Sequence, residues 1–132
     1  MTLVIQTLSW LHKLTNNYIG KHMTMMTLDD YMKDAEKVSF ISDIYAGRMT
    51  EWVIYDAKAC YHTSLLDKAR DEKDKESYRA AYDNMNDALS KLWKIAKFMP
   101  RSEIDNAQQQ LYVMRSQRAA DRLNEWRKRN GK

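Results

Sequence analysis

The sequence contains three glycines and one proline among 132 residues. A β-sheet needs turns, and tight turns use residues that tolerate a positive φ or fix φ in advance, chiefly glycine and proline. A chain of this length built mainly from strands would need several hairpins, and it has too few of the residues that form them. The scarcity of turn residues therefore predicts an all-α fold.

Hydrophobic residues recur at three- and four-residue steps along most of the chain, the spacing that places them on one face of a helix. The pattern is clearest from Tyr78 to Met99 and ends at Pro100, because proline lacks a backbone donor and disfavours helix in the preceding residue. Thr27 followed by Asp30 is typical of a helix N-terminus. These patterns predict a compact bundle of about five helices, at roughly residues 3–19, 28–46, 49–70, 76–99 and 103–129.

A length of 132 residues fits one domain, and we expect a single helical domain over residues 1–132 with a basic C-terminal helix. The single cysteine, Cys60, excludes an internal disulfide framework and a zinc site built from several cysteines. The apolar stretch 1–14 is too short to span a bilayer and lacks the leading positive charge of a signal peptide. We therefore expect an intracellular, cytoplasmic protein that has no membrane partner.

Residue types that carry catalysis or bind metals do not form a recognisable set. The histidines are His12, His22 and His62, and none belongs to a motif with a second ligand three or four residues away, the spacing that puts two ligands on one helical face. Cys60 and His62 are two residues apart and point in different directions on a helix. The glycines are isolated, so no phosphate-binding loop is predicted. The sequence favours a protein without enzymatic activity, bound metal or cofactor.

Positive charge is concentrated at the C-terminal end. Residues 115–132 hold seven basic residues against Asp121 and Glu125, a net charge of +5, whereas the rest of the chain has a net charge of −1. Because arginines recur here at three-, four- and seven-residue steps, we expect a solvent-facing ridge on a different side of the last helix from its apolar residues. The ridge consists of Arg115, Arg118, Arg122 and Arg129, continued by Arg127, Lys128 and Lys132.

We interpret the chain as a non-enzymatic interaction protein, a small helical binder or inhibitor that acts by occupying a surface of a macromolecular partner. The accessory proteins of phages and mobile elements are often of this kind. Guanidinium groups bind carboxylates in a forked geometry, so the expected partner is a protein with an acidic surface. Self-association through a helical face to form a homo-oligomer is also compatible with the pattern. The predicted contact residues are Tyr112, Arg115, Arg118, Arg122, Arg127, Lys128 and Arg129.

Other interpretations are compatible with the sequence. The same ridge suits the phosphates of DNA or RNA. Basic residues at a helix C-terminus also stabilise the helix dipole by about 0.3–1 kcal/mol each, which needs no partner at all. A helical enzyme would need a pocket that gathers Asp56, Cys60, Tyr61 or His62 with groups from another helix. The stretch 67–79, in which both signs of charge alternate, is interpreted as a solvated corner between helices or as an exposed stretch of one continuous helix.

Overall fold

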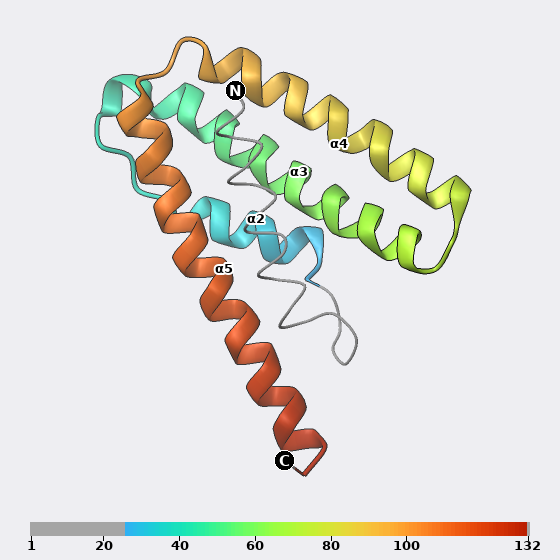
Figure 1. Ribbon diagram of the computed structural model, residues 1–132. Coiled ribbons are helices and arrows are strands. Elements are labelled where there is room, and N and C mark those ends of the chain that lie inside the picture. The colour runs from blue at the N-terminus through green and yellow to red at the C-terminus, as the bar shows by residue number, and fades with distance from the viewer. Residues whose placement is uncertain (1–25, 132) are drawn as a thin grey trace.

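The computed structural model describes residues 26–131, and this part of the chain is mostly helical and contains no strand (Figure 1). The all-α prediction is therefore confirmed. The described part contains four α-helices and one short 3-10 helix, and the helix expected over 3–19 lies outside the described residues. The elements are α2 (Leu28–Glu36), η1 (Asp43–Tyr45), α3 (Ala46–Asp71), α4 (Lys75–Ala96) and α5 (Arg101–Arg129).

Helices α3, α4 and α5 agree with the expected ranges, with ends shifted by at most three residues. The helix expected over 28–46 is wrong in its second half, since α2 ends at Glu36. The connection that follows is held open by side chains of α5, which supply the hydrogen bonds that a helix would have made. Glu103 accepts the backbone N–H groups of Ile41 (3.3 Å) and Ser42 (2.8 Å), and Gln110 accepts that of Ser39 (2.8 Å).

Helices α3 and α4 lie side by side as an antiparallel hairpin (Figure 1). The turn between them is a Schellman motif, in which the N–H of Asp74 donates to the carbonyl of Ala69 (2.9 Å) and the N–H of Lys73 to that of Arg70 (3.2 Å). Lys73 has a φ of 58°, the left-handed region that favours glycine. This turn places the end of α3 beside the start of α4.

Helix α2 packs against α3, and α5 crosses the outer side of both (Figure 1). The apolar side chains that these helices bury form one cluster. Its large members include Tyr31 from α2, Met49 and Trp52 from α3, Leu89 and Leu92 from α4, and Leu111 from α5. None of the helices within 26–131 has a stretch both long and apolar enough to cross a membrane.

Replacement of Leu111 by alanine is expected to lower the free energy of unfolding by about 2–5 kcal/mol, because it leaves a cavity in a fully buried position. Val113 lies two residues away on the same helix and is 54% exposed. Val113→Ala should therefore change the free energy of unfolding by less than about 0.5 kcal/mol. Urea unfolding of both variants tests the burial of this face of α5, and equal losses would contradict it.

Candidate functional site

Arg115 lies in the interior, where it is 2% exposed. Its Nη2 donates to Oδ2 of Asp56 on α3 at 2.6 Å, and its Nη1 to Sγ of Cys60 at 3.2 Å. The guanidinium also stands 5.3 Å from the centre of the Tyr31 ring. Arg115 therefore joins α5 to α3 and α2, and it has no solvent-facing surface to offer a partner.

Burial governs the chemistry of the groups around Arg115. Burial raises the pKa of the Cys60 thiol, so the sulfur is protonated at neutral pH and is a poor nucleophile. Burial also raises the pKa of Tyr31 to about 12, and its hydroxyl lies 3.2 Å from Oγ of Ser64. Burial opposes the charge of Arg115, but its surroundings as a whole, in which the Asp56 carboxylate accepts one of its hydrogen bonds, raise the pKa of the guanidinium. The cluster is a fixed ion pair within the core.

Arg118 and Arg122 lie closer to the surface and pair with acids of α2. Arg118 forks onto Asp34, from Nε to Oδ2 at 3.1 Å and from Nη2 to Oδ1 at 2.8 Å. Its Nη1 reaches Oδ1 of Asp30 at 3.4 Å, and Nη2 of Arg122 donates to the other oxygen of Asp30. Asp30 also accepts the backbone N–H of Thr27 at 2.8 Å as part of a capping box. The two arginines thus anchor α5 to the first turns of α2.

The prediction of a solvent-facing ridge is wrong for Arg115, Arg118 and Arg122, because their guanidinium groups bind internal carboxylates. At about 100° per residue, all three lie within about 40° of Leu111 around the helix axis, so they share its inward face. The ridge and the apolar stripe are therefore one face. Where α2 and α3 present aspartates, that face makes ion pairs; elsewhere it makes hydrophobic contacts.

The other predicted contact residues lie elsewhere on α5. Tyr112 is partly buried, one turn before the anchoring arginines. Arg127, Lys128 and Arg129 form the last turn of α5 and are exposed. Within residues 26–131, none of these three cations is in an ion pair with an acidic side chain. We call these three residues the basic end of α5.

The groups named for a possible enzyme line none of the grooves formed by the described residues. Asp56 and Cys60 are buried with Arg115, while His62 packs edge-on against Tyr61 with ring centres 5.2 Å apart. Burial, together with Lys58, lowers the pKa of His62, which favours the neutral ring. His12 and His22 lie outside the described residues. Across 26–131, no three His, Cys, Asp or Glu side chains are grouped in a way that could hold a metal ion.

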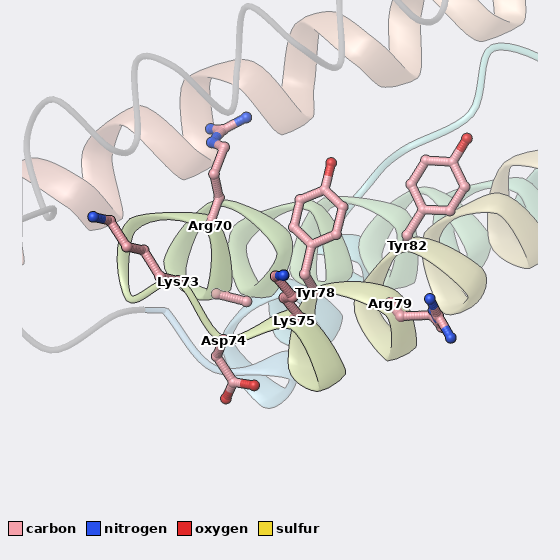
Figure 2. Close-up of a pocket in the computed structure, with 8 residues that line it drawn as sticks. Arg70, Lys73, Asp74, Lys75, Tyr78, Arg79 and Tyr82 are labelled. Atoms are coloured by element: carbon pink, nitrogen blue, oxygen red, sulfur yellow. The ribbon is translucent and has the colours of Figure 1, made fainter.

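An open groove of about 710 Å³ lies at the corner where α3 turns into α4 (Figure 2). We call it the corner groove. Four cations, two tyrosines and one acid line it, together with Ala69. Its charged and aromatic residues are Arg70, Lys73, Asp74, Lys75, Tyr78, Arg79 and Tyr82.

The sequence pattern did not indicate this groove, because the stretch 67–79 carries equal numbers of acidic and basic residues. In the fold, Glu72 lines a second hollow together with Lys68, whereas four cations and one acid line the corner groove. The one available signal was the spacing of Tyr78 and Tyr82, four residues apart and so on one helical face. No family model, curated protein or solved structure matches the chain.

Replacement of Arg115 by methionine is expected to lower the free energy of unfolding by about 3–5 kcal/mol, because it leaves the buried Asp56 carboxylate unpaired. The double variant Arg115→Met with Asp56→Leu should recover most of that loss, since neither charge then remains in the core. Gln109→Met, at an exposed position of the same helix, is the control. Urea unfolding measures all three, and a single variant no less stable than the control would contradict the assigned ion pair.

The ionisation of Asp30 predicts how the stability of the fold changes in acid. Burial raises its pKa, but the Thr27 N–H and the guanidiniums of Arg122 and Arg118 outweigh burial and hold it below the usual 3.8. The stability that Asp30 contributes is thus present at neutral pH and is lost as the pH falls through 3.8 and then through the lower pKa of the folded protein. Thermal unfolding from about pH 6 to about pH 2 should therefore show a shallower acid loss in Asp30→Asn than in the wild type.

Asp29→Asn is the matched control for that experiment, because Asp29 is exposed and its ion pair within the described residues is a surface one, with Lys33 at 3.1 Å. It should retain the steepness of the wild type. If Asp30→Asn and Asp29→Asn lose stability in acid to the same extent, the pairing of Asp30 with the α5 arginines contributes nothing to stability.

Proposed function

We propose that this protein is a non-enzymatic interaction protein that acts by occupying an acidic surface of a protein partner through the basic end of α5. One observation carries the proposal. The arginines nearer the middle of α5 are neutralised by Asp56, Asp34 and Asp30, whereas Arg127, Lys128 and Arg129 are exposed. The charge available to a partner is therefore confined to one end of the helix.

The anchoring of α5 supports this role. Four ion pairs and the buried Leu111 fix the helix against α2 and α3, and α5 then continues past α2 to its C-terminal end (Figure 1). A helix that is already ordered loses little conformational entropy when it binds. The basic end is thus presented in a fixed position, which favours recognition of a partner by the arrangement of its charges.

The chemistry of the interior also favours binding over catalysis. The thiol of Cys60 is buried and protonated, and the carboxylate of Asp56 is occupied by Arg115. General acid–base and nucleophilic catalysis need such groups at a surface that a substrate can reach. Among the described residues, the groups whose pKa values are shifted most are Tyr31, Cys60 and Arg115, and these groups instead pack α5 against α2 and α3.

Charge reversal at Arg127, Lys128 and Arg129, each to glutamate, is expected to abolish capture of a specific partner from a lysate of the native host. The interface would then oppose like charges instead of pairing opposite ones. Affinity purification with quantitative mass spectrometry measures the loss. Circular dichroism checks that α5 remains folded, since removal of three cations from a helix C-terminus costs about 0.3–1 kcal/mol each.

The matched control reverses three exposed lysines elsewhere, Lys37, Lys94 and Lys97, and so changes the net charge equally. The same partner should still be captured by this control. A partner captured equally by both triple variants would place the interface elsewhere. Binding of the wild type to duplex DNA that the α5 variant loses would instead support the alternative, that the basic end contacts nucleic-acid phosphates.

A further inference from the structure

The corner groove displays an aromatic pair that the core does not use. Tyr78 and Tyr82 lie on one face of α4 with nearly parallel rings, at 14°, and ring centres 6.4 Å apart. Tyr82 is 47% exposed, and neither ring belongs to the hydrophobic core. Large aromatic side chains gain stability from burial, so the exposed ring of Tyr82, with the half-buried ring of Tyr78 beside it, is available to pack against a planar ligand.

Positive charge surrounds these rings. Arg70, Lys73, Lys75 and Arg79 are all exposed, and Arg70 also contacts Asp67 within α3 at 2.5 Å. Figure 2 shows Arg70 and the two tyrosines rising from the same side of the hairpin, whereas the carboxylate of Asp74 points the opposite way.

Asp74 does not neutralise the groove, because its carboxylate caps α4. Oδ1 of Asp74 accepts the backbone N–H of Ser77 at 3.1 Å, and Oδ2 accepts the Ser77 hydroxyl at 2.7 Å. These hydrogen bonds lower the pKa of Asp74 and commit its charge to the helix N-terminus. Among residues 26–131, the single acid that lines the groove is thus directed away from it, because its carboxylate caps α4.

The backbone conformation of Lys73 also suggests that the groove binds a ligand. It occupies the left-handed position of the Schellman motif, where a non-glycine residue is strained. Glycine at this position would form the same turn without that strain. A lysine stands here although stability favours glycine, which is the pattern expected when the side chain serves binding.

We propose that the corner groove binds single-stranded nucleic acid, whose bases stack on Tyr78 and Tyr82 while its phosphates contact the surrounding lysines and arginines. Exposed aromatic rings beside a cationic groove are the two elements that bind single strands with little sequence preference. Paired bases in a duplex hide their faces, and an acidic peptide offers carboxylates but no planar ring to stack. This site lies apart from the basic end of α5 and does not depend on the function proposed for it.

The test is fluorescence anisotropy of the full-length protein with a fluorescein-labelled 20-nucleotide oligothymidylate, with oligouridylate and a duplex of the same length as comparisons. We expect both single strands to bind at low salt more tightly than the duplex. The logarithm of the affinity should fall with the logarithm of the salt concentration with a slope of about −2 to −3, as contact with three or four phosphates predicts.

Variants of the aromatic pair separate stacking from charge. Tyr82→Ala should weaken binding of the single strand by roughly 5- to 100-fold, the effect of losing one stacked base. Tyr82→Phe keeps the ring and should bind as the wild type does. If Tyr82→Ala binds as tightly as Tyr82→Phe, stacking is absent and the proposal is overturned.

Variants of charge and of the turn complete the experiment. Lys73→Gly should raise the urea concentration of half-unfolding and yet weaken binding, a combination that a purely structural role for Lys73 does not produce. Lys73→Glu with Lys75→Glu should weaken binding at least tenfold and flatten the salt slope by roughly 1 to 2. The control Lys94→Glu with Lys97→Glu changes the net charge equally and should leave most of the affinity intact.

Three further outcomes overturn the proposal. One is the absence of binding to either single strand at low salt. A second is binding that charge reversal of Arg127, Lys128 and Arg129 abolishes while the groove variants do not, because the phosphates would then contact α5. A third is displacement of the strand by polyglutamate at equal charge concentration, with no effect of Tyr82→Ala, which identifies a site for acidic peptides.

Discussion

The position of α5 depends on charged side chains that are buried against the other helices. The side chain of Glu103 accepts the backbone N–H groups of Ile41 and Ser42, and Arg115 pairs with Asp56 in the interior. Hydrophobic contacts alone would allow α5 to slide or rotate, because Ala107 and Ala119, two of its buried apolar residues, are small. Each charge is tolerated in the interior only with its partner in place, so these contacts select one register of α5.

Local features of the fold were predictable from the sequence, and features fixed by distant residues were not. The helical class and the end of α4 near Pro100 follow from turn residues and hydrophobic spacing alone. The early end of α2 does not, because no glycine or proline marks it. Residues 39–42 leave the helix since Glu103 and Gln110, more than 60 residues away, satisfy their backbone groups. A local pattern contains no information about such partners.

In the candidate sites, too, the local features were predictable from the sequence and the long-range contacts were not. The concentration of arginine in α5 was visible in the sequence, but its neutralisation by Asp30, Asp34 and Asp56 required the positions of α2 and α3. The spacing from Leu111 to Arg115, Arg118 and Arg122 already places all four on one face, and that geometry argued against a ridge separate from the core. At the corner, a turn of three residues brings Arg70 of α3 and Arg79 of α4 to one groove, although acidic and basic residues merely alternate along the chain.

Arginine therefore has two roles along one face of α5: it pairs with internal aspartates near the middle of the helix and is exposed at the end. The length of α2 decides where one role gives way to the other. Nine residues of α2 span about 13 Å, whereas the 29 residues of α5 span about 43 Å. Arg122 still has Asp30 opposite it, but Arg129, two turns further along the same face, lies at the end of α5 and is exposed. Arginine suits the inner positions because its planar group forks onto carboxylates, which lysine cannot do. The outer positions need only charge, and there Lys128 stands between two arginines.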